Sequence, residues 1–204
     1  AKVKSNQTIL QVSGDAKAVL SCERTVLNLL ARMSGIATQT SLLVSKIRKI
    51  NRKTKLYSTR KTAPGLRFFD KEAVAIGGGH KHRMSLNDMV MIKDNHLLVS
   101  NSIENITKNA RKQHRDVEVE VENQRDAMIA ASSGATIVML DNFSPAQIKK
   151  TISALQKKKI RNKIKLEASG GINSKNISAY AKTGVDIISV GSITNSVRGL
   201  DLSL

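Results

Sequence analysis

The sequence has little of what extracellular and membrane proteins depend on. A single cysteine, Cys22, rules out a disulfide within the chain and fits a reducing compartment. No apolar run approaches the roughly 18–20 residues that a membrane span requires. Residues 1–7 are polar and basic and lack the apolar stretch of a signal peptide. These absences predict a cytoplasmic protein that does not engage a membrane.

Aromatic side chains are scarce as well. Tryptophan is absent and aromatic residues make up 2% of the chain, whereas hydrophobic residues make up 40%. The core must therefore be aliphatic, built from Ile, Leu, Val, Met and Ala. So few rings also argue against a platform for single-stranded nucleic acid, on which bases stack against aromatic side chains.

Acidic residues are outnumbered: 16 Asp and Glu face 34 Lys and Arg, which gives a net charge of +18. Such an excess fits a solvated lysine-rich surface, a nucleic-acid binder or a site for polyanionic small molecules. The lysine clusters at residues 46–55 and 149–165 have the spacing of solvated helix faces and turns. The informative basic residues lie beside glycines and apolar strands, so we expect no nucleic-acid partner.

Apolar residues alternate between helical and extended spacing along the chain. The predicted strands are residues 55–59, 89–92, 117–121, 136–140, 164–168 and 186–190. The predicted helices are residues 21–50, 66–74, 103–112 after an N-cap at Ser102, 126–131, 174–181 and the segment that starts at Ser144-Pro145. Gly35 either divides the first helical stretch or marks close packing. The alternation predicts an α/β fold with a parallel sheet, and six strands favour a barrel.

The beginning of the chain does not fit this alternation. It starts without Met, and residues 3–19 have the pattern of short extended pieces around Gly14. We expect that an N-terminal portion is missing from this chain or belongs to another one.

Polar, charged and glycine residues gather just after the predicted strands. They are Arg60, Lys61, Lys93, Asp94, Glu120, Asp141, Ser169, Gly170, Gly171 and Gly191. In parallel α/β folds the carboxyl ends of the strands line the active site, so this distribution predicts an enzyme.

The residue types indicate the chemistry of that site. We expect Arg60, Lys61, His82, Arg83 and Lys93 to converge on an anion, because several cations favour one and arginine can bind a carboxylate through two hydrogen bonds.

Two acids and two glycine-rich turns complete the set. Glu120 and Asp141 suit a metal, sugar hydroxyls or a developing positive charge, and oxygen ligands beside a phosphorylated substrate favour Mg²⁺. Glu118 shares a face with Glu120 and Glu122, so this face must be polar and could form part of the barrel interior; structural pairing with lysine is the alternative interpretation of Glu118 and Glu122. The turns at residues 169–171 and 191–192 could bind a phosphate through backbone N–H groups.

Several runs then resemble one known family. The segment from Ser58 to Arg67, STRKTAPGLR, resembles the TRKT-x-PGLR signature of quinolinate phosphoribosyltransferases. Further runs follow in family order: ERTVLN from Glu23, MSGIAT from Met33, GGGHKHR from Gly77, IKDNH from Ile92, EVEVE from Glu118, LDN from Leu140, LEASGG from Leu166 and VG from Val190.

The resemblance implies an open (β/α) barrel joined to an N-terminal α/β sandwich domain. Residues 1–20 would then be the tail of the sandwich domain, with the rest missing from this chain, and residues 21–204 the catalytic barrel. It implies transfer of phosphoribosyl from phosphoribosyl pyrophosphate to quinolinate with decarboxylation, giving nicotinate mononucleotide, CO2 and pyrophosphate. It also implies Mg²⁺ as cofactor and a homodimer or higher assembly.

The resemblance assigns roles residue by residue. Arg24 would complete the neighbouring subunit's site and contact quinolinate. Quinolinate would be bound by Arg60, His82 and Arg83, with Lys61 and Lys93 nearby. The ribose hydroxyls and Mg²⁺-pyrophosphate would be held by Glu120 and Asp141, and the 5′-phosphate by Ser169, Gly170, Gly171 and Gly191. The catalytic residues would be Lys61, Glu120 and Asp141.

One departure and two alternatives remain open. Asn195 stands where the family often has histidine, which puts an acid–base role at that position in doubt. A related group found with molybdate-transport genes shares these motifs, and the net charge leaves a nucleic-acid binder as the alternative of a different class.

Overall fold

The computed structural model describes residues 2–100 and 102–204, so Ala1 of the predicted N-terminal tail lies outside the described residues. The strands are β1 (Lys55–Tyr57), β2 (Val90–Ile92), β3 (Val117–Val121), β4 (Ile137–Asp141), β5 (Lys165–Ser169) and β6 (Ile187–Ser189). The helices are α1 (Ala16–Arg48), α2 (Arg67–Ile76), α3 (Asp94–Ser100), α4 (Ile103–Gln113), α5 (Gln124–Ser132), α6 (Pro145–Lys157), α7 (Ile177–Ala181) and α8 (Ser192–Asn195), with a 3-10 turn η1 (Arg161–Lys163).

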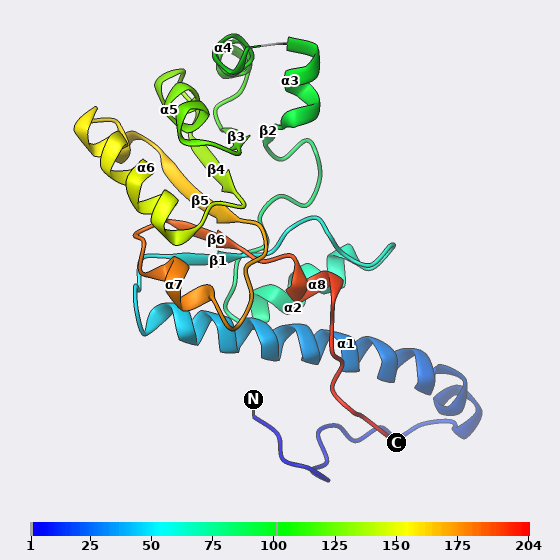
Figure 1. Cartoon of the computed structure of the whole chain (residues 1–204). Coiled ribbons are helices and arrows are strands. Elements are labelled where there is room, and N and C mark those ends of the chain that lie inside the picture. The colour runs from blue at the N-terminus through cyan, green and yellow to red at the C-terminus, as the bar shows by residue number, and fades with distance from the viewer. Residues whose placement is uncertain (1, 101) are drawn as a thin grey trace.

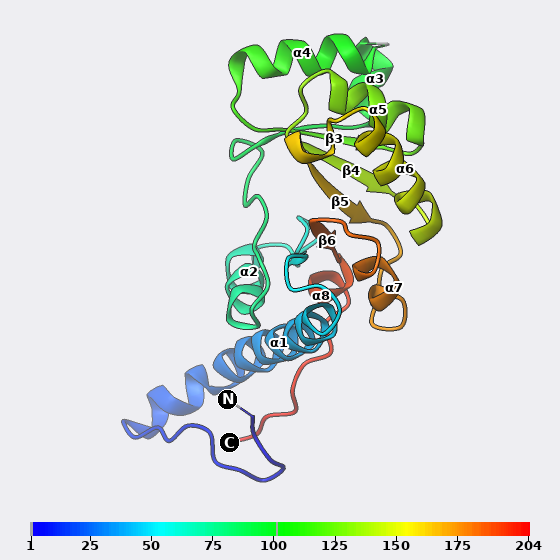
Figure 2. The ribbon, with the colours of Figure 1, turned by 90° about the vertical axis from the view of Figure 1, so that its left-hand side faces the viewer.

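The strands form one parallel sheet in the order β1-β6-β5-β4-β3-β2. Within the described residues its edge strands β1 and β2 do not pair with each other, so the barrel is open. Helices α4 to α6 cover one face of the sheet, and α1 runs beneath the β1–β6 end (Figures 1 and 2). The predicted α/β open barrel is therefore confirmed.

The core is mainly aliphatic, as the composition predicted. Its largest fully buried apolar side chains are all Ile or Leu, and Phe143 and Tyr180 are the aromatic residues among the described core residues. The N-cap predictions also hold. Ser144 and Gln147 form a reciprocal capping box before Pro145, and Ser102 accepts from the N–H of Asn105 at the start of α4.

Helix α1 differs most from the sequence prediction. It runs unbroken through Gly35 and through the predicted domain boundary at residue 20. The side chain of Asp15 accepts from the N–H of Ala18, so residues 16–19 are helical and their prediction as extended was wrong. Gly35 marks close packing instead of a break, because a Cβ there would lie 2.1 Å from the backbone oxygen of Arg198.

The two halves of α1 lie in different surroundings. Its buried residues all follow Gly35, whereas Leu20 and Val26 in the first half are 66% and 45% exposed. The first half projects away from the sheet (Figure 1). No helix in the described part of the chain is both long and apolar enough to cross a membrane.

Candidate active site

The carboxyl ends of the parallel strands meet at one edge of the sheet, and predicted site residues follow them there. In the strand register, Asp141 at the end of β4 lies beside Ser169 at the end of β5. Lys93 directly follows β2, and its Nζ lies 2.9 Å from Oε2 of Glu120 in β3. Four neighbouring strand ends thus contribute to one polar surface.

The charges at this edge act on one another. Burial and the charge of Glu120 raise the pKa of Asp141, whereas the charges of Lys61 and Lys93 lower it. Coupling of this kind requires that the groups lie close together. The structure therefore brings together Lys61, Lys93, Glu120 and Asp141, which the sequence had placed after four different strands.

An ion pair between the partly buried Arg32 and the fully buried Asp70 fixes the loop that carries Lys61. Arg32 of α1 donates to both oxygens of Asp70, at 2.7 and 2.9 Å, and to the backbone oxygen of Thr194 at 2.8 Å. Asp70 also accepts from the N–H of Ala63, and the hydroxyl of Thr194 donates to the backbone oxygen of Lys61 at 2.8 Å. Helix α1 is thereby connected to both sides of the Lys61 loop.

The predicted phosphate turns lie next to these acids. Gly170 has a φ of 89°, and a Cβ there would lie 2.1 Å from Oδ1 of Asn142, so another residue would be strained and crowded. Asn142 in turn donates through Nδ2 to Asp141 at 2.7 Å. At the other turn, a Cβ on Gly191 would lie 3.5 Å from Cδ of Lys61.

His82 enters the inner face of the sheet from the segment that follows α2. Its side chain is 7% exposed, and Nε2 lies 3.2 Å from Glu118 of β3 and 3.6 Å from Glu167 of β5. Burial lowers the pKa of His82, but the charges of the two glutamates beside its Nε2 outweigh burial and raise the pKa to about 9. The ring is therefore an imidazolium at neutral pH.

The two glutamates around His82 are the residues that sequence reasoning missed. Both are fully buried, and burial followed by the charge of Glu167 raises the pKa of Glu118 to about 6. Of the two interpretations of Glu118, the structure supports the polar interior and not lysine pairing, because the strand turns Glu118 inward to His82. Glu122 lies exposed beyond the strand. The available signal was a glutamate within each of two strands, flanked on both sides by apolar residues.

Two arginines border the same interior. The Nε of Arg60 is buried, and it has no hydrogen-bond partner among the described residues. Arg83 donates from Nη2 to Sδ of Met91 at 2.8 Å. Burial and the charge of Arg60 lower the pKa of Arg83, so the two guanidinium groups lie near each other.

Arg24 lies apart from the other predicted site residues. Its side chain is 75% exposed on the projecting half of α1, and its ion-pair partner in the structure is the adjacent Glu23 at 3.7 Å. Within one chain, the structure does not bring Arg24 close to the other predicted site residues.

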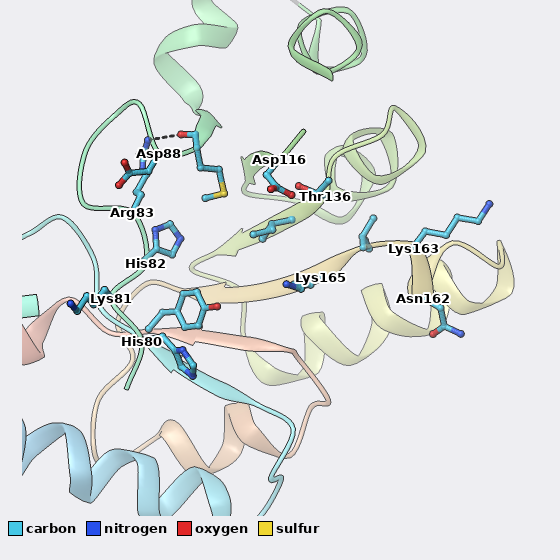
Figure 3. Close-up of a pocket in the computed structure, with 14 residues that line it drawn as sticks. His80, Lys81, His82, Arg83, Asp88, Asp116, Thr136, Asn162, Lys163 and Lys165 are labelled. Carbon is cyan, nitrogen blue, oxygen red and sulfur yellow. Dashed lines mark hydrogen bonds between the residues drawn. The ribbon is translucent and has the colours of Figure 1, made fainter. Parts of the chain in front are cut away.

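A cavity of about 660 Å³ opens at the opposite ends of the strands (Figure 3). Asp116, Thr136 and Lys165 line it at the starts of β3, β4 and β5, and His82 and Arg83 form another part of its wall. Glu120, Asp141 and Lys61 do not line it. We place the site at the carboxyl edge, because the interacting charges gather there.

Comparison with known proteins agrees with this arrangement. A sequence model described as quinolinate phosphoribosyl transferase, C-terminal domain, matches residues 36–204, and the corresponding N-terminal domain matches residues 1–34. The junction between these matches lies inside α1.

Relatives match nearly the whole chain. A probable carboxylating nicotinate-nucleotide pyrophosphorylase of Methanothermobacter thermautotrophicus is 46% identical over 99% of this chain and 74% of its own length. The carboxylating nicotinate-nucleotide pyrophosphorylase of Mycobacterium leprae is 42% identical over 100% of this chain and 71% of its own length.

A solved structure supports the same conclusion. The nicotinate-nucleotide pyrophosphorylase from Francisella tularensis superposes with a TM-score of 0.84 at 44% identity, over 92% of this chain and 65% of that one. This chain thus spans just under two thirds of that structure. The chain belongs to the quinolinate phosphoribosyl transferase family.

Proposed function

We propose that this chain carries the site that transfers phosphoribosyl from phosphoribosyl pyrophosphate to quinolinate in NAD biosynthesis. The products are nicotinate mononucleotide, CO2 and pyrophosphate. The observation that carries the proposal is the meeting of Lys61 and Lys93 with Glu120 and Asp141 at one sheet edge. The names of the relatives, carboxylating nicotinate-nucleotide pyrophosphorylases, support it.

Quinolinate, with two carboxylates, is the ligand that we assign to the cations. Arg60 offers a buried Nε that no described residue engages, and His82 carries a positive charge at neutral pH. Arg83 lies beside them, and Lys61 and Lys93 extend the positive surface toward the acids. Arginine suits a carboxylate because its planar group can donate two parallel hydrogen bonds.

The ribose and pyrophosphate are assigned to Glu120 and Asp141. Mg²⁺ fits this donor set, because both residues offer the carboxylate oxygens that it prefers. Lys93 already binds one oxygen of Glu120, which favours contact between Glu120 and Mg²⁺ through a water molecule. When bound, Mg²⁺ would neutralise charge on the pyrophosphate. The group of His82 with the two buried glutamates fits Mg²⁺ less well, since its one nitrogen ligand is protonated.

The 5′-phosphate is assigned to the two turns, at Ser169-Gly170-Gly171 and at Gly191. Both follow parallel strands, and barrel phosphate sites commonly lie after the last two strands. Asn195 lies at the second turn, where its Nδ2 would be 3.7 Å from a Cβ on Gly191. An amide there can donate a hydrogen bond and carries no charge.

The reaction follows from these positions. The pyridine nitrogen bonds to the anomeric carbon as the bond to pyrophosphate breaks, and the electron pair leaves with pyrophosphate. The carboxylates of Glu120 and Asp141 stabilise the positive charge that develops on the ribose. The electron pair of the C–carboxylate bond then stays on the ring carbon next to the cationic nitrogen, whose charge stabilises it. CO2 leaves, and that carbon takes a proton from water. No protein nucleophile is required.

The proposed assembly is a homodimer or higher oligomer in which Arg24 completes the neighbouring site. Its support is the exposed position of Arg24 on the projecting half of α1. Mixing Arg24→Ala with a Lys61→Ala variant tests it, since mixed dimers would regain one intact site. We also propose a cytoplasmic location, because the exposed free thiol of Cys22 suits a reducing compartment.

The decisive experiment measures turnover with Mg²⁺ and phosphoribosyl pyrophosphate, with quinolinate and nicotinate supplied separately. We expect nucleotide and matching CO2 from quinolinate alone. Nucleotide from nicotinate, or from neither acid, would overturn the proposal.

A variant sharpens this experiment. Lys61→Ala should lose most turnover, by about 100-fold or more as expected for a charge aimed at the reacting groups. Lys61 is exposed, so the fold should survive. Near-wild-type kinetics would remove Lys61 from the mechanism.

A further inference from the structure

We propose that Lys71 of α2 is a positioning residue that holds His82 and Arg83 in place for recognition of the quinolinate carboxylates. This inference rests on the proposed function. Lys71 is fully buried, and its Nζ donates to the backbone oxygens of Lys81 and of Arg83, the latter at 2.9 Å. Its two acceptors are the residues immediately before and after His82.

The backbone at His82 needs such support. His82 has a φ of 53°, in the left-handed region that residues with a side chain rarely adopt. A strained conformation persists when the surrounding contacts determine it from several sides. Here one ammonium group binds both flanking carbonyls, which fixes the direction in which the His82 side chain leaves the backbone.

The beginning of the segment around His82, residues 80 and 81, is held as well, but by β1 and the residue after it and not by α2. The N–H of His80 donates to Leu56 of β1, and the hydroxyl of Ser58 donates to the backbone oxygen of Lys81 at 3.0 Å. These contacts attach residues 80 and 81 to β1. On the far side of His82, Lys71 binds the backbone oxygen of Arg83, and Arg67, also of α2, donates to that of Met84 at 3.3 Å.

If Lys71 served only to fill space, its buried ammonium group would lower the stability of the fold without any benefit. Burial, followed by the charges of Arg67, Arg60 and Arg83, lowers its pKa to about 8. No carboxylate forms an ion pair with it among the described residues. A buried ammonium without such a partner is unfavourable, and an apolar side chain of similar length would fill the same space without that penalty. What the ammonium group adds, and an apolar side chain could not, is the pair of hydrogen bonds to the two backbone carbonyls.

The test uses two variants. Lys71→Met keeps an unbranched side chain, one atom shorter, and removes the donor. Lys71→Gln keeps an amide nitrogen with two N–H groups, which stands one bond short and is uncharged. We expect the KM for quinolinate to rise about 10- to 100-fold in Lys71→Met, as a misplacement near 1 Å can cause. The Gln variant should lie between Met and wild type. The KM for phosphoribosyl pyrophosphate should stay within about twofold, because the ribose and phosphate groups lie elsewhere.

Lys150→Met is the matched control, since it removes one cation from the exposed face of α6. It should change neither KM. A Lys71→Met variant with an unchanged KM for quinolinate, or with both KM values raised alike, would overturn the proposal. Should the Met variant not fold, a Lys71→Gln variant with wild-type KM and an undisplaced turn would contradict the proposal equally.

A structural readout separates this inference from the proposed function. Crystal structures of wild type and Lys71→Met should show the backbone of residues 81–83 displaced and His82 out of the left-handed region. If wild type makes no nucleotide from quinolinate, the proposed function fails, and the displacement still decides whether Lys71 positions His82. An undisplaced turn would refute the positioning role whatever the activity.

Discussion

Two groups of buried charges in this protein are built in opposite ways. Arg32 and Asp70 match each other: the guanidinium donates to both carboxylate oxygens, and a backbone N–H adds a third contact. Around His82, two fully buried carboxylates share one ring. Both oxygens of Glu118 and one of Glu167 have no hydrogen-bond partner within the described residues.

Under the proposed function, the difference separates a structural charge pair from a group of charges that binds substrate. A satisfied pair holds elements together, here α1, α2 and α8 around the Lys61 loop. An unsatisfied group costs stability, and perturbed buried charges of this kind concentrate at functional sites. The two carboxylates keep His82 cationic, so that a positive charge is available to bind an anion in a poorly solvated interior.

The largest effect should come from breaking the matched pair. Arg32→Met leaves Asp70 fully buried without its cation, and we expect the free energy of unfolding to fall by about 3–5 kcal/mol. Urea denaturation measures it. Adding Asp70→Asn should recover part of the loss, because the stranded charge disappears. A loss under about 1 kcal/mol would show that the pair does not hold the loop.

Glu118→Gln should raise the free energy of unfolding at neutral pH, whereas Arg32→Met should lower it. The pKa of Glu118 is raised to about 6 in the fold, so its contribution favours folding below its ordinary pKa near 4.5 and is lost as pH rises through 6. The glutamine variant should lack that loss and gain on the order of 1–2 kcal/mol over wild type at pH 7. Quinolinate binding should nevertheless weaken. Unfolding curves at pH 4.5 and 7 give the comparison.

The charge of His82 should survive to unusually high pH. With its pKa raised from 6.5 to about 9, His82 contributes stability that is fully present below pH 6.5 and is lost as pH passes 9, and in the folded protein the ring stays cationic, and so able to bind an anion, up to about that pH. Quinolinate affinity should therefore be flat from pH 6.5 to 8. In Glu167→Gln the decline should begin at lower pH, and ring NMR shifts of His82 should follow it. A midpoint near 6.5 in wild type would contradict the assignment.

The smallest effect belongs to an exposed pair. Lys108 and Glu104 lie one helical turn apart on α4, with side chains 55% and 54% exposed. Solvent screening and side-chain entropy leave such pairs with little net stabilisation. Glu104→Gln should therefore give the same urea midpoint as wild type. A clear shift of the urea midpoint would mean that burial does not explain why Arg32→Met and Glu118→Gln change stability more than the exposed pair does.

Much of the fold could be predicted from local signals. Strand β3 and the caps at Ser102 and Ser144 follow from side-chain periodicity and local hydrogen bonds, which neighbours in sequence supply. Helix α3 was missed, because the residues after β2 matched a site motif and none of its side chains is buried. The first turn of α1 was missed because no apolar stripe marks an exposed helix end.

The sequence by itself determined the family, the alternation of strands and helices, and the residue types that follow each strand. Only the tertiary structure decided which charges meet. It turned Glu118 and Glu167 toward His82, paired Arg32 with Asp70, and placed the ammonium of Lys71 between two carbonyls. Each of these contacts joins residues from separate elements. Periodicity records which side of an element is buried, but partners across the core depend on how the elements pack.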